Sequence, residues 1–183
     1  MCGICPTRRK KCDIIYLRYI VNRGDIMIDK SKVACFSGHR KLPQNCEELR
    51  TKLKKEIIGL IERGVMFFGV GGAWGFDMLA EEMVLQLKEN YPHIRLILVL
   101  PCPPEQQTMK WSDDQRHRYY DILQKADKVR ILSPQYTGGC MLERNRHLVD
   151  NSAYLICYLR KQYGGTSYTV GYAKKQGLQI IPV

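Results

Sequence analysis

Apolar residues follow two alternating patterns along the chain from residue 32 onward. Short apolar runs predict buried strands, and they lie at 32–37, 65–70, 94–100, 128–132, 153–158 and 179–183. Longer segments between them carry apolar residues at helical spacing, at 45–63, 76–90, 113–126, 141–151 and 166–176. The stretch 101–110 is predicted to be a loop, because its three prolines disfavour regular structure.

Strands that alternate with helices predict right-handed crossover connections and a sheet covered on both faces. The predicted fold class is therefore α/β, a Rossmann-like three-layer sandwich with a mainly parallel sheet. A chain of 183 residues without an internal repeat fits one such domain, which we place at 32–183. Residues 1–31 are expected to form a basic N-terminal arm, either disordered or an upstream extension preceding a natural start at Met27.

Basic residues outnumber acidic ones, and the net charge is +11. Part of this excess is local, since residues 1–26 hold six Lys and Arg against two Asp. The remainder of the chain is still basic, which favours anionic partners such as nucleotides or nucleic acid.

The eight cysteines are not arranged like a disulfide framework. Several fall inside predicted strands, where we expect small buried hydrophobic side chains. Cys2 and Cys5 have half of a zinc-knuckle spacing, but no second pair follows, so no metal and no cofactor are expected. The apolar stretch 14–21 is too short to span a bilayer. We expect a cytoplasmic protein, with no membrane partner and with a homo-oligomer as one possibility.

Glycine, hydroxyl and basic residues gather after the predicted strands, at the edge where open parallel sheets bind ligands. Glycines at such turns let backbone N–H groups approach an anion, or they simply permit close packing, and both interpretations stay open. His39 fits a base, a phosphate donor or a polar edge residue. The candidate ligand-binding residues are Ser37, Gly38, His39, Arg40, Gly71, Gly72, Ala73, Gly75, Asp77, Arg144, Asn145, Arg146, Gly164, Gly165 and Thr166.

These ordered motifs resemble the YpsA-like branch of the SLOG superfamily over roughly residues 32–183. The resemblance rests on FSGHR at 36–40, GGAxGFD at 71–77, LPC at 100–102, Trp111, RNR at 144–146 and GGT at 164–166. It implies a Rossmann-like nucleotide-binding fold. The superfamily also contains the LOG phosphoribohydrolases and DNA-processing protein A.

The LOG hydrolases cleave the base–ribose bond of nucleoside 5′-monophosphates. Their Arg-bearing motif resembles residues 141–145, which implies that role for Arg144, but no carboxylate follows the glycine loop at 164–171 as it does in those enzymes. Asp77 and Glu143 are the acids that could replace it, so Asp77, Glu143 and Arg144 are the candidate catalytic residues. An acid in the first turn of a helix also simply complements its dipole.

The sequence thus favours binding or sensing of a nucleotide or nucleotide-derived small molecule. A nucleotide N-glycosidase is the alternative. Single-stranded nucleic-acid binding ranks third and nucleic acid is not an expected partner, because the arginines fall at loop positions suited to a compact ligand rather than along a groove.

Overall fold

The computed structural model describes residues 29–183, beginning with a short 3₁₀ turn at Lys30–Lys32 that Asp29 caps. Most of the predicted N-terminal arm, residues 1–28, lies outside the described residues. The strands are β1 Val33–Gly38, β2 Phe67–Val70, β3 Arg95–Leu100, β4 Lys128–Ile131, β5 Tyr154–Tyr158 and β6 Gln179–Pro182. The helices are α2 Glu47–Glu62, α3 Phe76–Lys88, α4 Pro104–Gln107, α5 Asp113–Lys125, α6 Cys140–Asp150 and α7 Gly165–Lys175.

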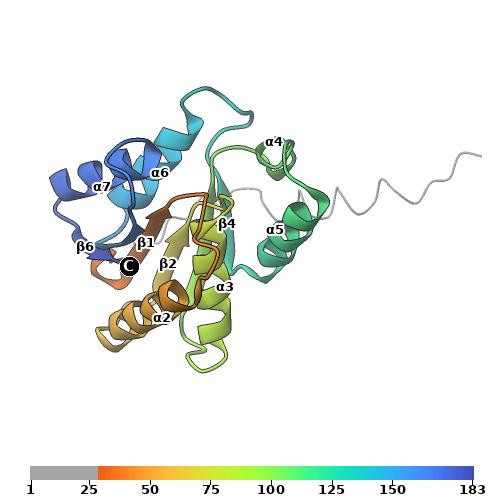
Figure 1. The fold of residues 1–183 in the computed structure, drawn as a ribbon. Helices are drawn as coiled ribbons and strands as arrows, with labels where there is room; N and C mark the ends of the chain where they lie inside the picture. Colours follow the sequence, from red (N-terminus) through yellow and green to blue (C-terminus); the bar gives the residue numbers. More distant parts are fainter. Residues whose placement is uncertain (1–28) are drawn as a thin grey trace, which may run out of the picture.

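The six strands form one sheet in the order β4-β3-β2-β1-β5-β6, and every neighbouring pair is parallel. Helices α2, α3 and α5 cover one face, and α6 and α7 pack together on the other (Figure 1). This confirms the predicted Rossmann-like α/β fold. The chain runs outward from β1 to β4 and then returns to place β5 beside β1, so the strand order reverses at that junction.

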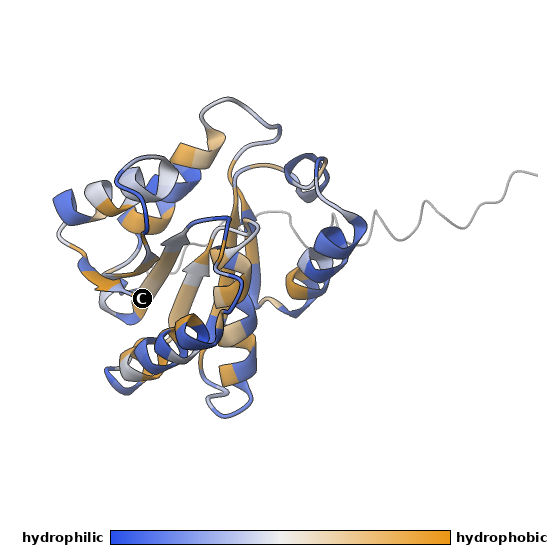
Figure 2. Ribbon diagram, in the orientation of Figure 1, coloured by the Kyte–Doolittle hydropathy of each residue, from blue (hydrophilic) through white to orange (hydrophobic). Residues whose placement is uncertain are grey.

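The core follows the apolar pattern that predicted the elements. In α2 the side chains at helical spacing, Leu49, Leu53 and Ile57, are all buried. Strand β1 contributes to both layers, because Phe36 packs into the core under α2 and α3 while Cys35 packs into the core under α6 and α7. Apolar positions accordingly line the sheet and the inner helix faces in Figure 2.

The stretch 101–110 was predicted to be a loop, and that prediction was wrong for one turn, because Pro104–Gln107 form the short helix α4. Pro104 occupies the first turn of this helix, where its missing N–H would have had no partner in any case. The other element boundaries differ from the predicted ones by no more than two residues.

No helix within residues 29–183 is long and apolar enough to cross a membrane. The same residues contain no group of three or more His, Cys, Asp or Glu side chains arranged to hold a metal ion. Their five cysteines are all free thiols.

Substitution of Gly75 tests how closely the loop that follows β2 packs against the loop that follows β1. Its φ is +94°, and a Cβ there would lie 2.3 Å from the Arg40 carbonyl oxygen. Gly75→Ala is expected to lower the free energy of unfolding in urea by at least about 2 kcal/mol, from backbone strain and overlap. Gly59→Ala is the matched control, because Gly59 lies inside α2 with nothing within 4 Å, and alanine there should add about 0.5–1 kcal/mol. Equal stability of Gly75→Ala and the wild type would contradict this packing.

Candidate functional site

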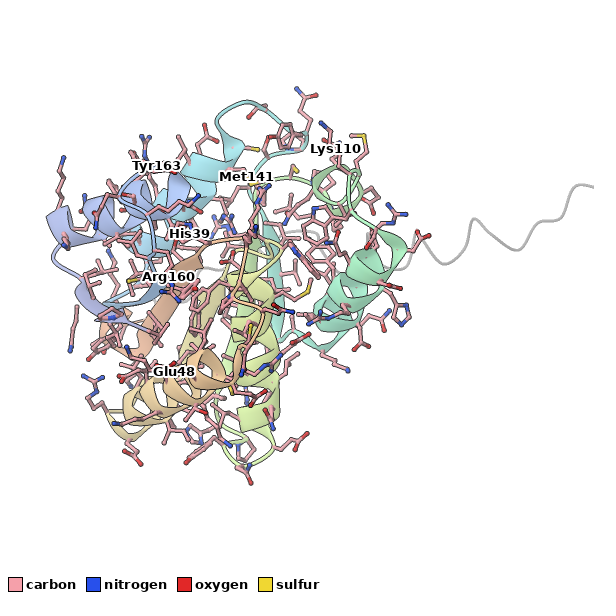
Figure 3. The ribbon with its side chains drawn as sticks, in the orientation of Figure 1. His39, Glu48, Lys110, Met141, Arg160 and Tyr163 are labelled. Atoms are coloured by element: carbon pink, nitrogen blue, oxygen red, sulfur yellow. The ribbon has the colours of Figure 1, made fainter. Side chains whose placement is uncertain are left out.

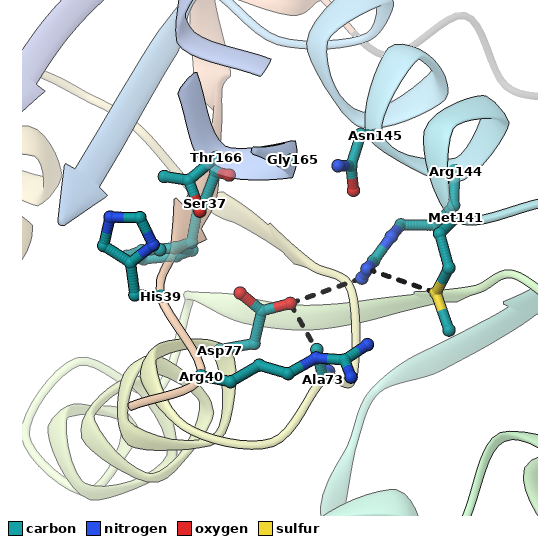
Figure 4. Close-up of a pocket in the computed structure, with 12 residues that line it drawn as sticks. Ser37, His39, Arg40, Ala73, Asp77, Met141, Arg144, Asn145, Gly165 and Thr166 are labelled. Carbon is teal, nitrogen blue, oxygen red and sulfur yellow. Dashed lines mark hydrogen bonds and ion pairs between the residues drawn. The ribbon is translucent and has the colours of Figure 1, made fainter. Parts of the chain in front are cut away.

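A cavity of about 320 Å³ opens at the carboxyl ends of β1 and β5, where the strand order reverses (Figure 4). Two of its lining residues, His39 and Met141, are labelled in the whole molecule in Figure 3. Ligands bind at such switch points in open parallel sheets. The cavity is lined by Phe36, Ser37, Gly38, His39, Arg40, Ala73, Asp77, Met141, Arg144, Asn145, Gly165 and Thr166. Two thirds of the predicted ligand-binding residues are therefore brought together at one place.

The other predicted residues do not line the cavity: Gly71, Gly72, Gly75, Arg146 and Gly164 lie behind it or beside it. Glu143, a candidate catalytic acid, is exposed on α6 and also lies outside the lining. Sequence reasoning missed Phe36 and Met141 as lining residues. For Met141 a signal was available, because it precedes Arg144 by three positions on one helix and so shares its face.

Arg144 and Asp77 form a buried ion pair in the cavity wall. Arg144 Nη1 lies 3.3 Å from Asp77 Oδ2, and the two residues are only 5% and 6% exposed. The Ala73 N–H donates to the same carboxylate oxygen at 3.3 Å. Burial raises the pKa of Asp77, while the neighbouring guanidinium opposes the rise. Removing one partner of such a pair leaves an uncompensated buried charge, which costs about 3–5 kcal/mol.

The Arg144 guanidinium is not saturated by the described residues. Its Nε is buried without an acceptor, and Nη2 contacts only the Met141 sulfur, at 4.0 Å. A sulfur is a weak acceptor, so two of the nitrogen atoms lack a strong partner. Nε is closed off from the cavity, but an oxyanion in the cavity could supply a strong acceptor to Nη2.

Gly71 and Gly38 are explained by close packing. A Cβ on Gly71 would lie 1.0 Å from Arg144 Nη1, so the guanidinium rests directly on the Gly71 backbone. A Cβ on Gly38 would lie 2.3 Å from the Phe76 ring. At these positions the packing interpretation of the glycines holds.

Two backbone N–H groups of the loop at 71–75 donate hydrogen bonds to buried acidic side chains. Glu81 Oε1 accepts the Gly72 N–H at 3.0 Å, just as Asp77 accepts that of Ala73. Burial, followed by the nearby Asp77 charge, raises the pKa of Glu81 well above its usual value. Sequence reasoning missed Glu81, which looks like an ordinary helix residue. This loop has therefore turned two of its N–H groups inward, away from any phosphate.

The glycine loop before α7 is different, because its surroundings are open. Cβ atoms on Gly164 and Gly165 would meet nothing within 4 Å. No side chain caps the N-terminus of α7, and its first turn holds no acidic residue. Gly165 and Thr166 bring this end of the helix to the cavity. Free N–H groups and the helix dipole favour an anion at such a position.

His39 connects two loops at the mouth of the cavity. Its Nε2 accepts the backbone N–H groups of Arg160 at 3.0 Å and Lys161 at 3.3 Å. A ring nitrogen that accepts cannot carry a proton, so the neutral ring carries its proton on Nδ1. Burial and the Lys161 charge both lower the pKa of His39. The ring lies beside Ser37 and Thr166 in Figure 4, where it can act as a hydrogen-bond donor rather than as a base.

Arg146 and the tryptophans have partners away from the cavity. Arg146 Nε donates to the Tyr168 hydroxyl at 2.7 Å, and its guanidinium lies over the Tyr168 ring. Trp74 and Trp111 pack edge-to-face with centroids 6.3 Å apart, and neither lines the cavity. None of these three side chains is therefore part of the cavity lining.

The fold and the cavity together define a Rossmann-like α/β protein with a polar cavity at the switch point of its sheet. The model of the YspA SLOG family (YpsA) matches residues 35–180, and the chain therefore belongs to this family.

Named relatives are UPF0398 proteins. One from Halalkalibacterium halodurans is 34% identical over 134 residues, which cover 72% of this chain and 70% of that protein. Another, from Brevibacillus brevis, is 28% identical over 131 residues, covering 70% and 69%.

Among solved structures, DNA processing protein A from Helicobacter pylori is similar, with a TM-score of 0.59 and 19% identity. The match covers 85% of this chain and 66% of that one. That structure is described as giving insight into a unique single-stranded DNA binding mode. At this identity the likeness establishes the fold alone.

The His39 contacts predict a pH-dependent loop. Because the pKa of His39 is lowered by folding, its contribution to stability is complete above its ordinary value of about 6.5 and is lost as the pH falls below that value. Protonation puts a donor on Nε2 and breaks both loop contacts. Two neutral hydrogen bonds contribute about 1–2 kcal/mol, so amide exchange protection of Arg160 and Lys161 should fall about 5- to 30-fold on acidification.

The measurement is amide hydrogen exchange by NMR, corrected for intrinsic rates. His39→Gln can place an amide oxygen near the Nε2 position and should remove the pH dependence. The shorter His39→Asn should leave both amides unprotected at every pH. Unchanged protection in the wild type between pH 8 and pH 5 would exclude this role for His39.

Proposed function

We propose that the protein binds a phosphate-bearing nucleotide derivative in this cavity, as a binding or sensing module. The observation that carries the proposal is the unsaturated, buried Arg144 guanidinium in a cavity that also receives the uncapped N-terminus of α7. Both features favour the same chemistry, an oxyanion with several acceptor oxygens. The phosphate of the ligand would lie between them.

Further groups support an anionic ligand of small size. Arg40 is exposed at the rim of the cavity, and His39 can donate from Nδ1. The volume of about 320 Å³ lies at the lower end of the range for small-molecule sites, roughly 300–1,000 Å³. A mononucleotide-sized ligand fits this range better than a nucleic-acid strand, which needs an open groove with stacking platforms. Nucleic acid is therefore not the proposed partner.

An N-glycosidase is the second candidate, because Asp77 does place a carboxylate in the cavity. The resemblance to the LOG hydrolases implies a need for an acid that stabilises the cationic ribose, and residues 164–171 supply none. Asp77 is instead committed to Arg144, and Glu143 lies outside the cavity. These placements favour binding over hydrolysis.

Arg144 variants test the phosphate site. Arg144→Ala should weaken binding of adenine nucleotides by about 1.5–3 kcal/mol, because a charge-assisted contact is lost. Arg144→Lys keeps the charge opposite Asp77 and should still bind more weakly than the wild type, since lysine lacks the planar fork. Arg146→Ala is the control, because Arg146 lies on the same helix but outside the cavity.

Binding is measured by calorimetry and by thermal shift, where a ligand at 100 times its dissociation constant adds about 2.7 kcal/mol of stability. Unaltered affinity in folded Arg144→Ala would place the ligand elsewhere. No shift with any of a broad panel of nucleotides at millimolar concentration would overturn the binding proposal itself.

Incubation with AMP and related monophosphates tests the second candidate. We expect no multiple-turnover release of free base by chromatography, because the carboxylate in the cavity, Asp77, is paired with Arg144, and this pairing opposes its use to stabilise positive charge on a ribose. Robust release that Asp77→Asn abolishes and Glu143→Gln spares would instead establish the hydrolase.

A further inference from the structure

One oxygen of Asp77 has no partner among the described residues. Both contacts of the carboxylate, from the Ala73 N–H and from Arg144 Nη1, end on Oδ2. Figure 4 shows the other oxygen turned away from these contacts, toward the side of the cavity where Ser37 and Thr166 lie. Only 6% of the surface of Asp77 is exposed, so a hydrogen-bond donor can reach this oxygen only from the cavity.

A carboxylate in the wall constrains what the cavity can hold. Phosphate oxygens carry negative charge and no protons, so Asp77 repels them, and they are expected away from Oδ1, near Arg144 Nη2 and Gly165 at the start of α7. The vacant acceptor needs a donor, and a neutral hydroxyl supplies one without a second buried charge. The hydroxyls of Ser37 and Thr166, both largely buried in the lining, can pair with further hydroxyls of the same ligand.

The cavity therefore combines two chemistries within the dimensions of one small molecule. One wall attracts an oxyanion, and the other accepts hydrogen bonds from hydroxyls. A phosphorylated pentose carries both groups a few bonds apart. A deoxyribose phosphate, as in DNA, carries the anion but lacks one of the hydroxyl donors.

We propose that Asp77 Oδ1 accepts a hydrogen bond from the vicinal hydroxyls of a ribose, so that the site selects ribose phosphates over their deoxy counterparts. This inference rests on the proposed function and adds the sugar to it. Asp77 is then a specificity-determining residue, held in place by the same Arg144 that faces the phosphate.

The test compares the affinities of AMP, 2′-deoxy-AMP and 3′-deoxy-AMP for the full chain by calorimetry. Loss of a hydrogen bond to a charged acceptor should weaken at least one deoxy compound about 10- to 100-fold. Ribose 5-phosphate and 2-deoxyribose 5-phosphate form a second pair. Discrimination in this pair as well would assign the recognition to a free sugar phosphate, whereas binding of only the nucleotides would show that the base is also required.

Asp77→Asn provides the matched substitution. Its amide oxygen can still face Arg144, which leaves an NH₂ donor in place of the charged acceptor, so the ratio between AMP and its deoxy analogues should fall to a few-fold. Glu143→Gln removes an acid from the exposed face of α6 and should leave the ratio unchanged. Because the readout is a ratio within one variant, a partial loss of stability in Asp77→Asn does not affect it.

The possible failures are distinct. Equal affinity of the wild type for AMP and both deoxy compounds would overturn the ribose inference and leave the phosphate site intact. A ratio in Asp77→Asn equal to that of the wild type would show that another residue accepts the hydroxyl. Failure of all five compounds to bind would overturn the proposed function and, with it, this inference.

Discussion

A buried guanidinium joins parts of this protein that lie 67 positions apart in the sequence. Arg144 reaches from α6 across the carboxyl ends of the strands to Asp77 at the start of α3, and thereby links the two helical layers. The surrounding residues are fitted to this one contact. Gly71 has no side chain because the guanidinium lies against it, and burial together with the Asp77 charge raises the pKa of Glu81. The positive charge of Arg144 thus acts on both buried acids, because it opposes the rise that burial causes in the pKa of Asp77 and of Glu81.

The alternation of apolar runs and amphipathic segments predicted the fold and nearly all of its elements, because burial on both faces of a parallel sheet leaves a strong pattern. The edge of the sheet at which the cavity lies was predicted from the same topology. The one-turn helix at Pro104–Gln107 was not predicted, because the sequence does not distinguish a proline in the first turn of a helix from a proline in a loop.

The roles of individual glycines could not be predicted, because they depend on what lies opposite each one in space. Gly71 and Gly165 occur in similar motifs, yet one is covered by Arg144 and the other faces open space. The same is true of acids. Glu81 has the sequence context of a surface residue, and only the packing of α3 against the loop at 71–75 makes it a buried partner of the Gly72 N–H. Periodicity identifies the face of a helix, but not which neighbour a polar group on that face will meet.

The strand order has a consequence for how the protein matures. The cavity takes one part of its lining from β1 and α3, and the other from α6 and α7, which follow them in the sequence. Strand β1 also gains its second neighbour only when β5 arrives. During synthesis the first four strands can associate while the ribosome is still working, yet Asp77 lacks its ion-pair partner Arg144 until α6 has emerged. A nascent chain therefore has no complete cavity until both α6 and α7 have emerged from the ribosome.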